Sequence, residues 1–481
     1  MKRILSLIFA FLICFMLCSP AFSELIGTTY YIDSVNGNNE NSGRTEDEAF
    51  KDFSSLLGNT YYGPGDKILL KRGSRFTQTL IIDGCGSEDN PILISAYGEG
   101  SNPVITMPEL SYNPLLFLHN VSYLILENID FKDNYNSLFI YPTDGYIMSN
   151  IEVRNCGFYN LSYKPDDPDI RCNAIQMDYN GSSIYHDIYI HDLTFVDCGG
   201  GIETKGIDRE TDDIFIDEKT SYNYNVRFEN LYMENLLYDG IILGSLRDSV
   251  VTKCRFINTC QSNAFVTAPL WTHHCDNVTM EYCEICGSNG NKDGMTIDFD
   301  GWSTNCTYQY IYSHDNKRFM RNCLFDSETH NRNNTVRYCL SVNDNRGMNY
   351  PSFAIPNDTG FPTTSDNFSF YNNTLINCSP ILWINLKNVT IKDNIFIGDT
   401  VTAITSIFML PISFGKNTIE GNVCYKYYSF LLNNSIMKKP EFAGGNSESI
   451  YNYMLKEDSP YAGKGCFTEE SISEMAKIPT A

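Results

Sequence analysis

The chain has 481 residues, of which 42% are hydrophobic and 19% are charged. These fractions exclude an intrinsically disordered chain, and the length suits one large domain or several small ones. The sequence carries 35 Lys and Arg against 58 Asp and Glu, a formal net charge of -23. So acidic a protein is a poor ligand for nucleic acid or for an anionic membrane, and we expect neither as a partner.

The N-terminus has the pattern of an export signal. Lys2 and Arg3 precede a mostly apolar run over residues 4–18, which is too short to span a bilayer comfortably. Small residues, Ala21 and Ser23, stand where a signal peptidase reads. We therefore expect residues 1–23 to be a cleaved signal peptide, and the mature protein to be secreted and free of the membrane.

Cysteine is frequent, with 17 in the chain. An exported protein can form disulfides. Several of these cysteines, however, recur at one position of an internal repeat, among them Cys156, Cys254 and Cys283. The recurrence favours thiols stacked in a core over a disulfide framework.

Residues 24–120 differ from the rest of the chain. Residues 30–33 are predicted as a strand, residues 36–43 as a polar turn and residues 46–57 as a helix. Two further strands are predicted at 64–73 and 91–98. An open solenoid end is an unpaired strand edge, so we interpret 24–120 as an N-terminal cap with the first coils.

A repeat fills residues 121–435. Segments of the form apolar-x-apolar-x-polar return about every 28 residues, without helical periodicity, which is typical of one β-solenoid coil per repeat. The central residues of these segments are Phe131, Phe158, Phe195, Met233, Phe256, Ile285, Ser313, Ser341, Leu375, Phe396 and Cys424. They predict an all-β solenoid of about eleven or more coils, each stacked about 4.8 Å from the next.

A second row lies two residues beyond each central position. It is made of the turn-forming residues Asp133, Asn160, Asp197, Asn235, Asn258, Gly287, Asp315, Asn343, Asn377 and Gly398. Such side chains bond to the backbone and tolerate left-handed geometry. The row predicts a turn at this point of every coil and favours a structural role for Asp315.

Six segments resemble those of a known group of proteins. Residues 31–37, 64–69, 90–98, 293–300, 309–316 and 455–460 are similar to secreted right-handed parallel β-helix proteins of the pectin-lyase-like class. The resemblance implies a right-handed parallel β-helix and a carbohydrate ligand. It leaves the reaction open, because the class holds polysaccharide lyases and glycoside hydrolases. We expect a monomer, with residues 436–481 as a tail covering the last coil.

A third row is predicted from segments that read polar-small-apolar. It would stack Asp239, Asn263, Asp293, Lys317 and Arg346 along one side of the solenoid. The small residue beside most of them would leave room for a ligand. Asp239 and Asp293 would lie two coils apart, about 9.5 Å at the backbone. That separation is close to the range for an acid/base pair that leaves space for a water molecule.

The densest acidic group of the repeats is Asp293, Asp298 and Asp300. Asp298 and Asp300 are two residues apart, so on a strand their side chains face the same way. Asp293 and Asp300 also each precede a glycine, so Asp-Gly turns are an alternative interpretation. Trp302 lies nearest the group and is a candidate platform for a sugar ring.

The favoured hypothesis is a glycoside hydrolase that cleaves a plant or microbial polysaccharide or oligosaccharide without a cofactor. Asp293, Asp298 and Asp239 would act as acid, base or nucleophile, and Asp300 would tune their charge. His314, which faces outward by strand parity, is a further catalytic candidate; the alternative is a surface histidine without a role. The predicted substrate-binding residues are Asn263, Trp302, Lys317, Arg346 and Lys205.

Two alternatives come from other classes. A pectate-type polysaccharide lyase would use Lys205, Lys317 or Arg346 as the base or as the positive charge, and Asp298 and Asp300 would hold Ca²⁺. A glycan-binding protein without activity would keep the fold and lose the reaction.

Overall fold

The structure is a computed structural model. It describes residues 27–161, 172–206, 222–263, 266–290, 294–322, 331–344, 353–355, 365–378, 381–398, 412–414, 416, 418–425, 439–444 and 449–480. The predicted signal peptide and two predicted site residues, Asp293 and Arg346, lie outside the described residues.

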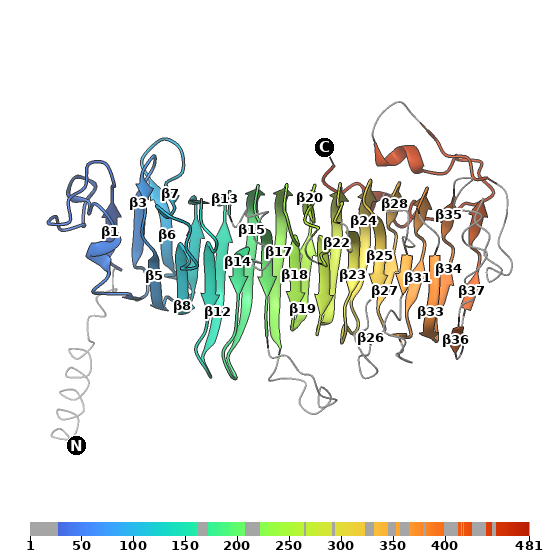
Figure 1. The fold of residues 1–481 in the computed structure, drawn as a ribbon, viewed down its shortest axis with the longest axis horizontal. Coiled ribbons are helices and arrows are strands. Elements are labelled where there is room, and N and C mark those ends of the chain that lie inside the picture. The colour runs from blue at the N-terminus through green and yellow to red at the C-terminus, as the bar shows by residue number, and fades with distance from the viewer. Residues whose placement is uncertain are drawn as a thin grey trace, which may run out of the picture.

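The chain forms a right-handed parallel β-helix, as predicted, with its coils stacked along one long axis (Figure 1). In the described residues two parallel sheets, of 23 and 15 strands, run along this axis, and we call them sheet A and sheet B. A coil contributes one strand to sheet B and two to sheet A, as β11, β12 and β13 do.

The strands of sheet B, in chain order, are β2 (Tyr61–Tyr62), β5 (Leu80–Cys85), β8 (Leu116–Ser122), β11 (Leu138–Tyr141), β14 (Asn173–Met177), β16 (Gly200–Thr204), β18 (Ile241–Gly244), β21 (Leu270–His273), β23 (Met295–Phe299), β25 (Arg318–Asn322), β26 (Asn331–Arg332), β29 (Phe353–Ile355), β30 (Ser365–Asp366), β33 (Ile381–Lys387) and β36 (Ile412–Phe414).

The strands of sheet A are β1 (Thr29–Ile32), β3 (Lys67–Lys71), β4 (Arg75–Phe76), β6 (Ile92–Tyr97), β7 (Val104–Ile105), β9 (Leu124–Glu127), β10 (Asp130–Lys132), β12 (Ile147–Arg154), β13 (Gly157–Tyr159), β15 (Ile184–Val196), β17 (Asn223–Glu234), β19 (Leu246–Thr252), β20 (Arg255–Ile257), β22 (Asp276–Cys286), β24 (Thr307–His314), β27 (Thr335–Arg337), β28 (Leu340–Val342), β31 (Ser369–Tyr371), β32 (Thr374–Ile376), β34 (Thr390–Lys392), β35 (Ile395–Ile397), β37 (Thr418–Glu420) and β38 (Val423–Tyr425).

The predicted central row is confirmed residue by residue. Every member from Phe131 to Cys424 lies directly beside the next in the strand register. The row also extends two coils further back, through Ile105 to Phe76. Phenyl rings stack along it, with the centroids of Phe158 and Phe195 4.7 Å apart. This apolar stack is the centre of the core.

The predicted turn row is also confirmed, because its first nine members all have a positive φ. Two more such columns occur in each coil, which the sequence reading did not recognise. One runs through Asn150, Asp187, Asn225, Asp248, Asn277, Asn305, Asn333, Asn367 and Asn388, and the other through Asn155, Asp192, Asn230, Lys253, Tyr282, Tyr310, Tyr338, Asn372 and Asp393. Left-handed residues therefore bend the described coils between residues 123 and 377 at three places.

The helix predicted over residues 46–57 is wrong. The segment forms two short 3-10 helices, Glu46–Glu48 and Phe53–Leu56, joined by extended residues. The Asp52 side chain accepts a hydrogen bond from the amide of Ser54 at the start of the second. Phe53 and Leu56 are buried there, so packing against the first coils decides the local conformation.

The cysteines of the described residues are free thiols, and all but Cys85 and Cys286 are buried. Burial raises the pKa of thiols such as Cys156 and Cys339 to about 12. They pack as small apolar side chains in the core, as the recurring positions predicted.

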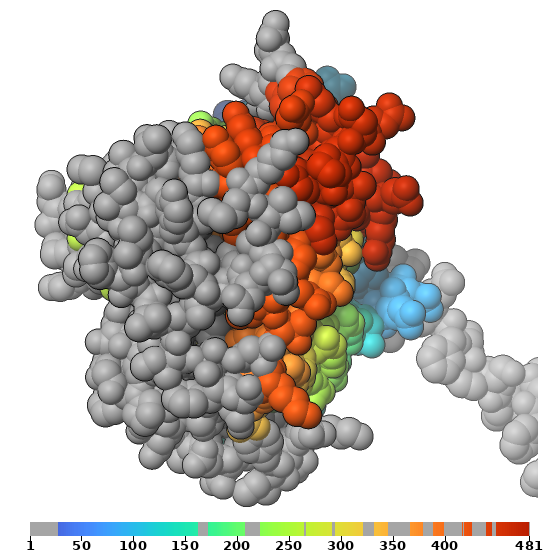
Figure 2. Space-filling view, turned by 90° about the vertical axis from the view of Figure 1, so that its right-hand side faces the viewer, coloured from blue at the N-terminus to red at the C-terminus, as the bar shows by residue number. Residues whose placement is uncertain are grey.

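The C-terminal segment runs back over the outer face of sheet A. Ile450, Phe467 and Met475 pack against Tyr282, Tyr310, Tyr338 and neighbouring core residues. The segment includes a 3-10 helix, Ile450–Tyr453, and the short helix α3, Ile472–Met475. Figure 2 shows it gathered on one side of the molecule. Within the described part of the chain, no helix has the length and apolar character needed to cross a membrane.

A buried carboxyl group, that of Asp344, interrupts the core. It accepts hydrogen bonds from the hydroxyls of Ser313 and Ser341 and from the amide of Asn316. Burial raises its pKa from 3.8 to about 6, although these hydrogen bonds act in the opposite direction. The folded protein therefore binds this proton more tightly than the unfolded chain does.

Because the pKa is higher in the folded state, stability contributed by protonated Asp344 is present below pH 4 and is lost as the pH rises through 6. The loss is on the order of 3 kcal/mol. We expect Asp344→Asn, which does not titrate, to gain stability relative to the parent by about this amount between pH 4 and pH 7. Unfolding in urea at several pH values measures the difference. A stability difference between Asp344→Asn and the parent that does not change with pH would contradict the raised pKa of Asp344. The control is Asp133→Asn, the same change at an exposed carboxylate.

Candidate active site

The outer face of sheet B carries the acidic residues singled out in the sequence. Here β18, β21 and β23 are neighbours, and Ile242, Trp271 and Asp298 lie side by side in one row. A second row, two residues further along the strands, contains Gly244 and His273. Asp300 continues this second row, because it directly follows β23 and its amide donates to the Thr272 carbonyl at 2.8 Å.

Asp298 and Asp300 form what we call the acidic pair. Phe299 between them is part of the core, so both carboxylates point away from it, as strand parity predicted. Their residues are only 6% and 9% exposed. Two carboxylates on one face of one strand, shielded from bulk water, are the residue types that acid/base chemistry needs.

The strand that carries the acidic pair is fixed from below. The buried Tyr308 hydroxyl donates to the carbonyls of Asp298 at 2.9 Å and of Leu270 at 3.0 Å. The Asn331 side-chain amide donates to the carbonyl of Phe299 at 3.0 Å. These bonds join two coils beneath the site, so the two carboxylates stand on a rigid support.

Asp239 lies behind Trp271 rather than in the open. It is fully buried, and its Oδ1 accepts hydrogen bonds from the Trp271 indole at 2.8 Å and from the Ala268 amide at 3.0 Å. These two bonds fix the orientation of the indole next to Asp298. The geometry therefore favours a positioning role for Asp239 over the acid/base role predicted for it.

Aromatic rings continue from Trp271 past the acidic pair. The centroids of Trp271 and His273 are 5.4 Å apart, those of His273 and His274 5.3 Å, and those of His274 and Trp302 6.3 Å. Trp302, predicted near the acidic group, lies at the end of this series. A Cβ at Gly244 would meet the His273 ring at 2.6 Å, so glycine is required there.

His273 and His274 do not alternate in direction as neighbouring residues of a regular strand would. His274 has a φ of 50°, which breaks the alternation of the strand. The two Nδ1 atoms consequently lie 3.1 Å apart. At this distance one ring nitrogen donates to the other, so the pair does not carry two full positive charges.

Lys205 lies in the same outward row as Asp300, but three coils away, or about 14 Å. Its Nζ is 3.6 Å from Glu203 and 3.9 Å from Asp178. Glu203 also accepts a hydrogen bond from the Asn173 side chain. The lysine is therefore held by carboxylates of its own coils and is not adjacent to the acidic pair.

The predicted third row slips in register. Asp239 is followed in its own register row by Ala268, Met295 and Arg318. Exposed Asn263 lies five residues before the aligned position, and Lys317 lies one residue before it. The corner between β20 and β21 is longer than the repeat predicted. The segment at Asn263 fits the polar-small-apolar pattern by chance. Among the described residues, Asp239, Asn263 and Lys317 therefore do not share one row.

The expected room for a ligand beside the small residues is also absent at Gly201 and Gly240. A Cβ on Gly201 would meet the Met233 sulfur at 2.9 Å, and one on Gly240 would meet the Phe256 ring at 2.6 Å. These glycines face the core, and the central row fills the space. The Nζ of Lys317 donates a hydrogen bond to the Gly290 carbonyl. Lys317 also lies four residues before Arg321, the residue that pairs with Asp298 in the strand register.

His314 lies on sheet A, away from the acidic pair. Its Nδ1 is 3.0 Å from Asp315 and its Nε2 is 3.5 Å from Glu284. Burial opposes its charge, but Cys286, Glu284 and Asp315 raise the pKa of His314 to about 11. A histidine that stays protonated at neutral pH is a poor general base, and the structure does not bring it to the site.

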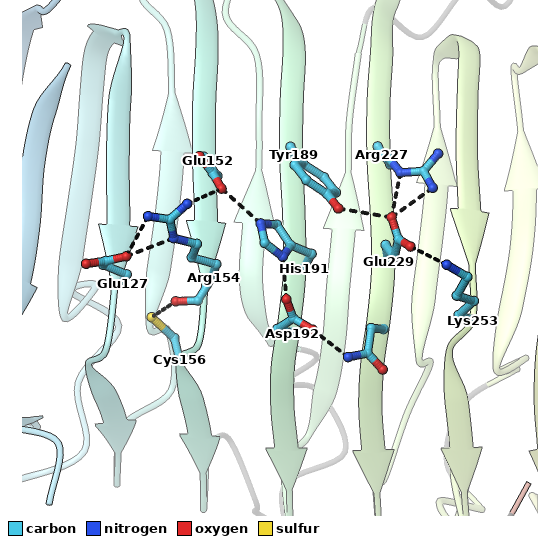
Figure 3. A network of polar contacts seen from close by, with 11 residues as sticks. Glu127, Glu152, Arg154, Cys156, Tyr189, His191, Asp192, Arg227, Glu229 and Lys253 are labelled. Atoms are coloured by element: carbon cyan, nitrogen blue, oxygen red, sulfur yellow. Dashed lines mark hydrogen bonds and ion pairs between the residues drawn. The ribbon is translucent and has the colours of Figure 1, made fainter. Parts of the chain in front are cut away.

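A second polar network covers the outer face of sheet A, where charged and aromatic side chains of successive coils meet (Figure 3). At its centre Glu229 accepts hydrogen bonds from Lys253, Arg227 and Tyr189. Burial raises its pKa, but these bonds outweigh burial and lower it to about 2. A carboxylate that remains ionised and is matched by cations stabilises the stacking of coils and is poorly suited to proton transfer.

No cluster of three or more His, Cys, Asp or Glu side chains with metal-binding geometry occurs among the described residues. Ca²⁺ binding by Asp298 and Asp300 stays a prediction. The sequence reading gave Trp271 and His273 no main role, although the structure sets both beside the acidic pair. Their signal was a tryptophan and a histidine two residues apart, one repeat before Asp298 and Asp300.

Comparison with known proteins supports the fold. No protein-family model matches the sequence. A lacto-N-biosidase of Bifidobacterium longum is 24% identical over 83% of this chain, which spans 31% of that protein's length. The solved structure of a lacto-N-biosidase of glycoside hydrolase family 136 from Eubacterium ramulus gives a TM-score of 0.56 at 19% identity, covering 82% of this chain and 68% of that one. A family PL6 alginate lyase gives 0.57 at 13%, covering 90% and 57%.

The role of Asp239 can be tested by two substitutions. Asp239→Ala leaves the Trp271 indole and a buried amide without their acceptor, and we expect a loss of about 1–3 kcal/mol of stability. Asp239→Asn keeps the side-chain oxygen and should lose much less. Urea unfolding of both variants, alone and combined with Trp271→Phe, measures the coupling between the two side chains. A catalytic carboxylate at 239 would instead make Asp239→Asn as inactive as Asp239→Ala while leaving its stability intact.

Proposed function

We propose that this protein is a glycoside hydrolase whose acidic pair, Asp298 and Asp300, acts on a glycan bound along the outer face of sheet B. The observation that carries the proposal is the pair itself: two shielded carboxylates on one rigid strand, next to an oriented indole. The similarity to lacto-N-biosidases, in sequence and in fold, supports the same reaction class. Asp293, six residues upstream of Phe299, is a third carboxylate that the tests include.

In the proposed reaction the two carboxyl groups have different roles. One, in its acid form, donates a proton to the leaving oxygen of the glycosidic bond, while the other stabilises or attacks the sugar carbon as positive charge develops. Trp271 supplies an apolar surface against which a sugar ring stacks. The bond from Trp271 to Asp239 keeps that surface in place.

The proposed substrate is an oligosaccharide that carries lacto-N-biose. The names of the relatives suggest it, and the charge of this chain agrees with it. A net charge of -23 and an acidic site repel a polyuronate, whereas a neutral glycan is not repelled. The chain spans 31% of the length of the Bifidobacterium longum lacto-N-biosidase. The activity of that whole protein is therefore only a proposal for this chain.

Elimination, the lyase alternative, is not supported by the position of Lys205. It needs a base and a positive charge next to the reacting carbon. Lys205 is about 14 Å from the acidic pair along the coil stack, and its Nζ lies within 4 Å of two carboxylates. The fold match to an alginate lyase does not distinguish the two reactions.

A product assay decides the reaction class. We expect release of lacto-N-biose from p-nitrophenyl lacto-N-bioside and from lacto-N-tetraose, with new reducing ends and no ultraviolet absorbance of an unsaturated uronide. The reaction should continue in the presence of a chelator. Absorbance that rises with alginate or pectate and disappears on chelation would replace the hydrolase by a Ca²⁺-dependent lyase.

The acidic pair is tested by Asp298→Asn and Asp300→Asn. Each change keeps the shape and removes a proton-transfer or charge-stabilising group, so we expect kcat to fall by at least about a hundredfold with Tm nearly unchanged. Asp133→Asn, the same change at a turn on the other sheet, should retain full activity. Asp293→Asn is measured in parallel. Full activity of both Asp298→Asn and Asp300→Asn would show that the site has been placed wrongly.

A further inference from the structure

A group of four rings lies on the same outer face of sheet B, several coils before the acidic pair. Phe117 and His119 come from β8, and Phe139 and Tyr141 from β11. All four are half-exposed. Ring centroids are 5.5 Å apart for Phe117 and Phe139 and 5.5 Å apart for Phe139 and Tyr141, with interplanar angles of 17° and 20°. We call these four residues the aromatic patch.

The backbone and one carboxylate hold the aromatic patch in place. Phe117 pairs with Phe139 and His119 pairs with Tyr141 in the strand register. The His119 ring contacts the carboxylate of Asp83 through Nδ1 and lies 6.4 Å from the Tyr141 ring. Four rings in a fixed arrangement lose little conformational freedom when a ligand binds.

The exposed rings on the outer face of sheet A are different, because cations cover them. Lys132 lies over Tyr159 at 4.6 Å, and Arg255 lies over Tyr232 at 5.6 Å. Within the described part of the chain no cation is found over Phe117, Phe139 or Tyr141. The patch therefore offers aromatic surface to a neutral partner, whereas the rings of sheet A are already occupied by the protein's own side chains.

The aromatic patch and the candidate active site share one outward register row of sheet B, in which Ile242 is buried. Phe139 is followed in one outward row by Gln176, Glu203, Ile242, Trp271 and Asp298. The patch and the acidic pair are five coil steps apart, about 24 Å. The residues between them include an amide and a carboxylate that can bond sugar hydroxyls, and apolar surface returns at Trp271. One strip of this kind matches a chain of sugars, each with an apolar face and a polar edge.

We propose that the aromatic patch is a distal subsite that binds the continuing chain of the same glycan. This inference rests on the proposed function and adds the substrate class, an extended rather than a short oligosaccharide. An enzyme that releases a two-sugar unit needs only a short binding site on that side of the cleaved glycosidic bond. A subsite about 24 Å away therefore belongs to the part of the chain that leaves.

Substrates of two lengths test the proposal. Phe139→Ala and Tyr141→Ala should leave kcat and KM unchanged with p-nitrophenyl lacto-N-bioside, which is too short to reach the patch. With a poly-N-acetyllactosamine chain capped by lacto-N-biose, we expect KM to rise about fivefold to tenfold at unchanged kcat. Tyr141→Phe, which keeps the ring, should restore most of the affinity. Tyr159→Ala on sheet A is the matched control and should change neither substrate.

Binding without turnover gives a second readout. In an Asp300→Asn background, calorimetry with the long chain should show weaker binding when Phe139→Ala is added, with Tm within a degree or two of the background variant. Equal affinities with and without Phe139→Ala, or equal losses with short and long substrates, would overturn the distal subsite. Failure of the parent protein to cleave the short substrate would instead overturn the proposed function, so the two failures are distinguishable.

Discussion

The bend of the chain at left-handed residues is the constraint on which the rest of the structure depends. Three residues in a coil such as that of Asn150, Asn155 and Asn160 adopt a positive φ, and Asn and Asp tolerate that conformation at the lowest cost among residues with a side chain. Their side chains then bond from coil to coil, as Asn235 does to Asp197 at 3.0 Å and Asn258 does to Asn235 at 3.3 Å. The turns therefore close each coil and also lock its register to the next.

A locked register is what makes the outer faces chemically distinct. Sheet A is closed by its own partners, since its carboxylates meet cations and the C-terminal segment covers its tyrosines. On sheet B an amide, an indole and two carboxylates lie in one register row. The same backbone geometry thus gives one face that stabilises the stack and one suited to a ligand.

The sequence predicted one repeating apolar row and one repeating turn, but it missed two further turn columns and the features that depend on a single coil. The central apolar row and its turn were readable because every coil must bury a side chain at one point and bend at another. The column through Lys253, Tyr282 and Tyr310 could not be predicted from residue type, because Lys and Tyr do not favour a positive φ. Tertiary packing imposes the left-handed geometry on them. Alternation correctly placed Asp298 and Asp300 on one face. The third row failed at Asn263 because corners vary in length and no buried contact marks them.

The interior beneath the acidic pair departs from the apolar rule of the other coils. Where Gly201 and Gly240 accommodate Met233 and Phe256, the coil of β23 has Thr296, whose hydroxyl bonds to Ser313 at 2.6 Å. Ser313 bonds in turn to the buried carboxyl of Asp344.

Stacked phenyl rings would fill this space with more apolar burial but would donate no hydrogen bond to the backbone. Tyr308 and Thr296 instead donate hydrogen bonds to the carbonyls of Asp298 and Arg318. Local rules of stability are usually broken where function requires a fixed geometry. In this chain the break coincides with the strand that carries Asp298, which is an argument for the site independent of the carboxylates themselves.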